Sequence, residues 1–240
     1  MTSAQSRTDI TGLLAALTAG NSSARLKAAL AIGTHAEPAA VDLLVTRSGV
    51  EPDFFVRDML TWALTRLPPE STVPRLVAEL RSGRAQDRGQ ALHTLSKIGD
   101  RSAWPAIMPA LLRDPDDEVA RTAWRTAVAL VPEQEKEALA AELARQFGRG
   151  DREVRLSLSR ALVALGDMIE PVLRTAMTDS DPEVRAHASA TERLLHDPDA
   201  GFELSVTAAT RIVALGPERS SSGQAGTNQP EPDDRESSAC

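Results

Sequence analysis

The most distinctive feature of this 240-residue sequence is how few aromatic and reactive side chains it contains. Tyrosine is absent, aromatic residues make up only 3% of the chain, and the single cysteine is the last residue, Cys240. Because one cysteine cannot form an internal disulfide, the sequence fits a reducing compartment. No apolar run approaches the roughly 18 residues that a membrane-spanning helix needs, and no signal peptide is recognisable. We therefore expect a cytoplasmic protein that does not enter a membrane.

Motifs for catalysis, metal binding and phosphate binding are missing as well. None of the four histidines stands at metal-ligand spacing from another histidine or a cysteine; they are His35, His93, His187 and His196. There is no glycine-rich phosphate loop and no Gly-x-Ser-x-Gly motif. The acidic run at 114–118 does not match a calcium-binding loop, so we expect its carboxylates to cap a helix and to be solvated. The sequence therefore predicts no catalytic residue, no metal site and no cofactor.

The sequence does contain an internal repeat, whose clearest copy lies in residues 51–68. In this copy an acidic residue, Asp53, stands three positions before Val56, which serves as the anchor, and an arginine follows the anchor. The other anchors are Ala24, Asp87, Val119, Val154 and Val184. The copy at Val119 lacks the adjacent arginine, and the nearest one after it is Arg121. The anchors recur every 30 to 35 residues, and a fixed period of this length is typical of solenoids.

Each repeat is interpreted as two helices joined by a turn. The second helix begins at the acidic residue, whose carboxylate can accept hydrogen bonds from the free N–H groups of the first turn. Apolar residues follow at helical spacing, as in Val56, Leu60, Ala63, Leu64 and Leu67. A glycine or proline then ends the helix, namely Gly99, Gly166 or Pro68. The first helix is shorter and has a proline near its start; these prolines are Pro38, Pro74, Pro105 and Pro171.

These signals predict six helix pairs followed by one more helix. The predicted helices span residues 8–17, 21–33, 38–47, 53–67, 72–81, 85–98, 102–113, 116–131, 134–147, 151–165, 169–178, 181–196 and 200–215. Residues 1–7 are expected to be disordered. Residues 216–240 are expected to form a disordered acidic tail, rich in Ser, Gly and Pro, with a net charge of −3. The predicted folded domain is therefore 8–215.

The repeat resembles the HEAT-repeat family, and its Asp-Pro-Glu-Val-Arg type of second helix is most similar to the HEAT-like repeats of phycobilin lyases. The resemblance covers roughly residues 8–215 and implies an all-α fold, a right-handed α-solenoid of about six HEAT-like helical hairpins plus a C-terminal capping helix. Tetratricopeptide and ankyrin arrays have similar periods, but a chain without tyrosine and without Thr-Pro-Leu-His matches neither. One fold hosts many functions, so the resemblance does not identify an activity.

The resemblance also implies that the second helices line the inner, concave face of the solenoid. On each second helix, the side opposite the buried stripe falls two, six and nine residues after the anchor. The sixth position aligns Trp62, His93, Arg125 and Arg160 in one column across adjacent repeats. Tryptophan and arginine are enriched at binding hot spots, so we predict a recognition groove there. Its candidate residues are Asp58, Trp62, His93, Arg121, Arg125, Arg160 and Arg193.

A structural role is the alternative for this column. In that case Trp62 packs against a neighbouring helix, and the arginines are simply solvated. The same spacing rule places Gly33, Ala186 and Ala190 on the concave face.

The other aromatic residues are expected to pack inside the protein. Phe54 and Phe55 lie in the first turn of a predicted helix, and we interpret them as covering an apolar seam between the first two repeats. Trp104 and Trp124 are expected to pack between repeats.

The function expected from these features is that of a non-catalytic scaffold that binds a partner protein or peptide. One alternative is a DNA-repair enzyme, because alkylpurine DNA glycosylases are similar in fold and use concave Trp, Asp and Arg residues. Asp58, Trp62 and Arg125 are of these types, but their order and spacing do not reproduce that family's motif. The net charge of −7 also disfavours nucleic acid, although a local basic strip could form from Arg121, Arg125, Arg152, Arg155 and Arg160. A second alternative is a regulatory or sensor module, because similar HEAT segments follow winged-helix regulator domains of the mercury-resistance type in bacteria.

Overall fold

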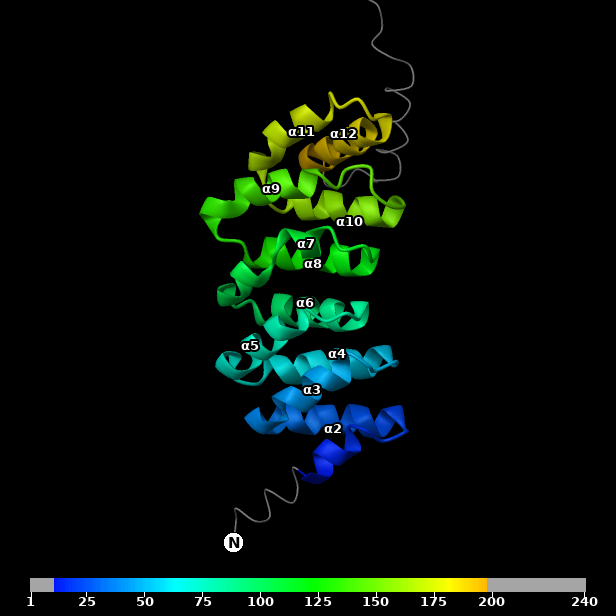
Figure 1. The fold of residues 1–240 in the computed structure, drawn as a ribbon, viewed down its shortest axis with the longest axis vertical. Coiled ribbons are helices and arrows are strands. Elements are labelled where there is room, and N and C mark those ends of the chain that lie inside the picture. The colour runs from blue at the N-terminus through cyan, green and yellow to red at the C-terminus, as the bar shows by residue number, and fades with distance from the viewer. Residues whose placement is uncertain (1–10, 198–240) are drawn as a thin grey trace, which may run out of the picture.

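The computed structural model describes residues 11–197, and this part of the chain is an all-α solenoid of six helix pairs without strands. The helices lie across the long axis of the molecule and follow one another in chain order from the N-terminal end to the C-terminal end (Figure 1). A short helix at 11–16 precedes the others. The remaining elements are α2 (Ser22–His35), η1 (Pro38–Ala40), α3 (Val41–Ser48), α4 (Phe54–Thr65), α5 (Pro69–Glu79), α6 (Ala85–Ile98), η2 (Arg101–Ala106), α7 (Pro109–Leu112), α8 (Asp117–Leu130), η3 (Glu133–Glu135), α9 (Lys136–Ala144), α10 (Arg152–Val163), η4 (Asp167–Ile169), α11 (Glu170–Ala176) and α12 (Pro182–His196).

The predicted repeat architecture is confirmed over this range. The predicted capping helix at 200–215 and the predicted disordered segments at 1–7 and 216–240 lie outside the described residues. Between residues 11 and 197, no helix is long and apolar enough to cross a membrane.

Aspartates start the second helices, as the sequence pattern predicts. Asp53, Asp116 and Asp151 each accept hydrogen bonds from two backbone N–H groups of the first turn, and Asp181 accepts one. The first pair uses Asn21, whose side chain accepts from the N–H of Ser23. These side chains satisfy N–H groups that have no partner within the helix, which fixes where these five second helices begin. The second helix of the third pair, α6, follows Arg84 and has no side-chain cap.

The first helices are less regular than predicted, because proline removes backbone donors. Pro74 does not lie near a helix start; α5 begins at Pro69, so Pro74 falls inside the helix. The helix predicted at 102–113 is split into η2 and α7, with Pro105 inside η2 and Pro109 at the start of α7. A proline cannot donate a backbone hydrogen bond, and its ring conflicts with the preceding turn of an α-helix. Pro38 and Pro171 lie at helix starts, as expected.

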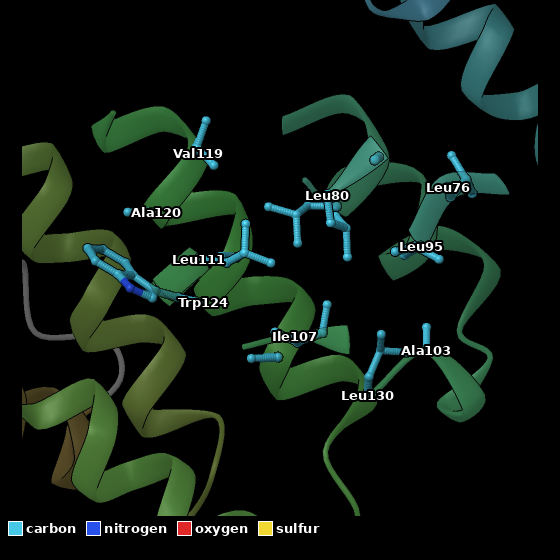
Figure 2. Close-up of a cluster of buried hydrophobic side chains, with 14 of the residues drawn as sticks. Leu76, Leu80, Leu95, Ala103, Ile107, Leu111, Val119, Ala120, Trp124 and Leu130 are labelled. Carbon is cyan, nitrogen blue, oxygen red and sulfur yellow. The ribbon is translucent and has the colours of Figure 1, made fainter. Parts of the chain in front are cut away.

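The helices form two layers, and the hydrophobic core lies between them. Each second helix contacts the next in the series from α2 through α4, α6, α8 and α10 to α12, while the first helices contact one another on the other side. Figure 2 shows part of the core, where apolar side chains of α5, α6, α7 and α8 meet. The indole of Trp124 is fully buried there, and its Nε1–H donates to the carbonyl of Leu112 at 2.8 Å. The prediction that Trp124 packs inside the protein is thus confirmed.

Small residues on the second helices are covered by their neighbours, which contradicts the spacing rule at three positions. A Cβ atom at Gly33 would lie 2.5 Å from Cζ3 of Trp62 and 2.8 Å from Cα of Ala63, so α2 and α4 touch through the glycine. Ala186 and Ala190 are also buried. The spacing rule treats every residue opposite the apolar stripe of its helix as exposed. A short side chain, however, lets the adjacent helix approach closely and cover that position.

In five of the six repeats an arginine follows the anchor and ties the second helix to the turn before it. Nη1 of Arg57 donates to the carbonyls of Glu51 and Pro52 at 2.8 and 2.9 Å, and Nη1 of Arg185 donates to those of Asp179 and Ser180 at 2.6 and 2.7 Å. The arginines at the same place in the other repeats, Arg25, Arg88 and Arg155, make similar bonds to carbonyls of the preceding turn. The repeated arginine therefore stabilises the turn rather than serving a ligand.

Several of these arginines also bind an acidic residue of the following repeat. Arg25 pairs with Glu51, Arg88 with Asp114, and Arg155 with Glu183. Asp114 was expected to be solvated but is buried, because it lies between the Arg88 guanidinium and the backbone N–H of Asp116. These ion pairs join neighbouring repeats along the stack.

The fourth repeat shows how the structure replaces a missing arginine. Its anchor is followed by Ala120, so no side chain from that position reaches the preceding turn. Arg149, from the turn of the next repeat, donates instead to the carbonyl of Asp114 and pairs with Asp117 at 2.7 Å. The guanidinium of Arg149 also lies over Trp124, 5.9 Å from the ring centroid. In the fourth repeat the carbonyl of the preceding turn is therefore bound by an arginine from the next repeat.

Candidate functional site

The face formed by α4, α6, α8 and α10 contains two adjoining hollows that meet at Arg125. One hollow of about 500 Å³ lies between α8 and α10, and the other, of about 670 Å³, lies over α4, α6 and the start of α8. The column of predicted residues runs along this face. His93 and Arg125 line the second hollow together, and Arg121, Arg125 and Arg160 line the first.

Arginines dominate the hollow between α8 and α10. Arg121 and Arg125 stand one turn apart on α8, and Arg152 and Arg160 face them from α10, beside one carboxylate, Glu153. Apolar and small side chains complete the lining, namely Val128, Leu156, Ser157, Ala161 and Ala164. The hollow thus combines positive charge with an apolar lining.

Two of these arginines lack a carboxylate partner in the described part of the chain. Nη2 of Arg125 donates only to the hydroxyl of Thr122, at 3.1 Å, and the side chain of Arg160 makes no hydrogen bond or ion pair within residues 11–197. Arg121, by contrast, pairs with Glu118 at 2.7 Å. Partial desolvation and the positive charge of Arg121 lower the pKa of Arg125, while Glu118 acts in the opposite direction. The residue itself is exposed on this face.

The second hollow joins a histidine, an arginine and an aromatic ring. His93 is half-buried, and burial lowers its pKa, as do the positive charges of Lys97 and Arg125, while Asp58 acts in the opposite direction. Phe54 lies at the opposite end of the lining, on α4. Arg57 lies beside Phe54 at this end, and the carboxylates of Asp116 and Glu118 accompany Arg125 at the other, so the hollow is polar along most of its length.

Phe54 and Phe55 are exposed, so the prediction that they cover an interior seam is wrong. Their exposed fractions are 65% and 71%, and their rings meet edge to face at 5.7 Å between centroids. The guanidinium of Arg57 lies 5.9 Å from the centroid of Phe54. Both residues belong to the first turn of α4, which projects beyond the apolar stripe that begins at Val56. No property of the residue type signals this exposure, because it depends on where the helix starts.

The other predicted residues differ in their relation to the hollows. Trp62 combines the two roles weighed for it: its ring packs on Gly33, and 37% of the residue remains exposed on the same face. Asp58 is exposed one turn before Trp62 on α4. Arg193 on α12 lines neither hollow, so the structure does not bring it to the site. Trp104 is half-buried and donates its Nε1–H to Glu135 of the next repeat, as expected for a residue between repeats.

A buried polar cluster at the C-terminal end was not predicted. His187, Ser159 and Thr191 are all at most 1% exposed. Nδ1 of His187 accepts from the N–H of Gly148 at 3.1 Å, so its proton resides on Nε2, which faces the carbonyl of Arg155 at 3.0 Å and the hydroxyl of Ser159 at 3.1 Å. A histidine that activates a serine must accept from it, and this tautomer does not. The cluster is therefore structural, and the buried histidine links α12 to α10.

Because His187 is buried in this cluster, we expect the folded protein to lose stability in mild acid. Burial lowers the pKa of His187 to about 4 from its ordinary value of 6.5. Between these values the unfolded chain binds a proton that the folded protein does not, so the free energy of unfolding falls as the pH falls from about 6.5 to 4, by about 3 kcal/mol. Chemical denaturation across this range checks the prediction. The His187→Gln variant should lose most of the dependence and His196→Gln, at an exposed histidine, should keep it; an unchanged slope in His187→Gln contradicts the assignment.

Comparison with known proteins finds limited similarity to solved structures and identifies no family. No family model matches the sequence, and a search of curated proteins finds no match. Among solved structures, an engineered protein is similar with a TM-score of 0.45 and 18% identity, covering 80% of this chain and 99% of the other. The complex of CpcE and CpcF of phycocyanin lyase from Nostoc sp. PCC7120 is similar with a TM-score of 0.45 and 19% identity, covering 82% of this chain and 85% of the other.

Proposed function

We propose that this protein is a non-catalytic scaffold that binds a partner protein or peptide along the face formed by α4, α6, α8 and α10. The observation that supports the proposal most strongly is the exposure of Phe54 and Phe55, of which Phe54 lines one of the two adjoining hollows. Exposed aromatic side chains leave a large apolar area in water, and a partner that covers them gains from its burial. Arginines without carboxylate partners lie farther along the same face.

The composition of this face matches that of interface cores. Aromatic residues and arginine supply most hot spots in protein complexes, usually within well-packed hollows surrounded by polar groups. Here the aromatic residues lie on α4 and the arginines on α8 and α10, so a bound segment would cross several repeats. The proposed location is the cytoplasm, in keeping with a single cysteine in the sequence.

Capture from lysate of the native host with immobilised protein tests the proposal. We expect the double variant Phe54→Ala and Phe55→Ala to lower affinity for the captured partner by roughly 30-fold or more, since even one hot-spot aromatic contributes about 2 kcal/mol or more. Both rings are exposed, so the variant should fold normally, as a circular dichroism spectrum can verify. Met108→Ala is the matched control, because Met108 is 49% exposed but lies in the other layer, beside α7. Equal recovery by all three proteins would contradict the proposal.

A further inference from the structure

We propose that the hollow between α8 and α10 binds carboxylate side chains of an acidic peptide segment, with Arg125 and Arg160 as the residues that recognise them. This inference rests on the proposed function and specifies the chemistry of the partner.

The charges in the hollow call for an anion. Arg125 and Arg160 face it from opposite helices, and neither has an ion pair within residues 11–197. Arg121 also lines the hollow, but it is already paired with carboxylates. Most other arginines in the described segment are paired with a carboxylate or bonded to carbonyl groups, as Arg88 and Arg57 are. An incoming carboxylate would give Arg125 and Arg160 the partner that they lack and form charge-assisted hydrogen bonds, which the planar guanidinium can make in pairs.

The remaining lining favours a peptide over a polyanion. Val128, Leu156 and Ala161 give the hollow apolar surface that can cover the methylene groups of glutamate or an apolar neighbour in the peptide. Glu153 lies within the same hollow, and Asp116 and Glu118 line the adjoining one. These carboxylates would repel the continuous phosphate backbone of a nucleic acid, and the net charge of −7 adds to the repulsion. The positive charge is thus confined to a small area that suits one or two side-chain carboxylates.

The arrangement also sets the direction of the bound segment. Arg125 lines both hollows, and the second hollow extends from it to Phe54 on α4. The lining on α6 between them is mostly polar, whereas Phe54 is an exposed ring. A segment whose carboxylates contact Arg125 and Arg160 would therefore cross α6 and place an apolar residue against Phe54. The fitting sequence has acidic residues at one end and an apolar residue at the other.

Selection from a library of short random peptides tests the inference. Peptides enriched on the wild-type protein should carry an excess of Asp and Glu on one side of an apolar residue. They should bind the double variant Arg125→Gln and Arg160→Gln about 10- to 100-fold more weakly, as expected when hydrogen bonds to charged groups are lost. The control removes the same charge elsewhere, through Arg81→Gln and Arg101→Gln. Both residues are exposed, belong to the other layer and have no ion pair in the described segment, so binding should be unchanged.

The outcomes separate this inference from the proposed function. Enriched peptides without an acidic excess, or peptides that bind Arg125→Gln and Arg160→Gln as tightly as wild type, would overturn the acidic-ligand inference. If such peptides still depend on Phe54 and Phe55, the proposed function stands. Enrichment of no peptide, or of peptides indifferent to every variant on this face, would overturn both. Binding of a single-stranded DNA oligonucleotide that Arg125→Gln and Arg160→Gln abolish would replace the acidic peptide with nucleic acid as the ligand.

Discussion

Replacing Glu51 with alanine is expected to lower the free energy of unfolding by about 3–5 kcal/mol. The Glu51 carboxylate is fully buried and binds Arg25 through two hydrogen bonds of 2.6 and 2.7 Å, Arg47 at 2.7 Å, and the backbone N–H of Asp53 at 3.0 Å. Without the carboxylate, the buried guanidinium of Arg25 has no countercharge. Burial alone would raise the pKa of Glu51, but these hydrogen bonds outweigh it and lower the pKa to about 2.

Urea denaturation measures this loss, with an exposed ion pair as the control. Asp42 pairs with Arg75 at 2.9 Å, but its side chain is 86% exposed, so Asp42→Ala should cost less than about 1 kcal/mol. The sign of the pH effect gives a second check. Because the folded pKa of Glu51 lies below its ordinary value of 4.5, its contribution is present above pH 4.5 and disappears as the pH falls towards 2. Equal costs for Glu51→Ala and Asp42→Ala would show that the buried pair does not join the first two repeats.

Replacing Trp124 with alanine is expected to cost about 3–5 kcal/mol as well. The residue has the largest of the fully buried side chains and contributes to the core shown in Figure 2. Its removal leaves a cavity and also leaves the carbonyl of Leu112 without the indole donor. Thermal or urea denaturation followed by circular dichroism measures the change.

Trp124→Phe separates the two causes. Phenylalanine keeps most of the apolar volume but cannot donate to Leu112, so this variant should cost about 1–3 kcal/mol. A cost below about 1 kcal/mol for Trp124→Ala would contradict the placement of this residue at the centre of the stack.

The helices of the repeats can be predicted from the sequence because the residues that determine them lie close together in the chain. The aspartates at the helix starts, such as Asp53 and Asp151, act on N–H groups two and three residues away, and the apolar stripe has the period of a single helix. The first helices were predicted less accurately, because Pro69 and Pro109 were not recognised as helix starts.

The candidate site was predicted only in part, because exposure depends on the neighbouring repeat. The column of His93, Arg125 and Arg160 does lie along the two hollows, since equal spacing from the anchor places these residues on the same side of successive helices. Gly33 is nevertheless covered, because the ring of Trp62 fills the space that a side chain would need. Phe54 is exposed for the opposite reason, since no helix of the described segment covers its ring at the start of α4. The burial of Gly33 and the exposure of Phe54 both depend on contacts between residues about thirty positions apart. Such contacts cannot be predicted from the residue type alone.

Site-specific photo-crosslinking in cells of the native host tests the central claim most directly. A photoreactive phenylalanine derivative is placed at position 54, and in a separate variant at position 108, where Met108 is exposed on the other layer. We expect a discrete cross-linked partner from position 54, little or none from position 108, and weaker cross-linking from position 54 when Arg125 and Arg160 are replaced by glutamine. Equal or stronger cross-linking from position 108 would contradict binding along the face formed by α4, α6, α8 and α10. Cross-linking from position 54 that is indifferent to the two arginines would contradict only their part in binding.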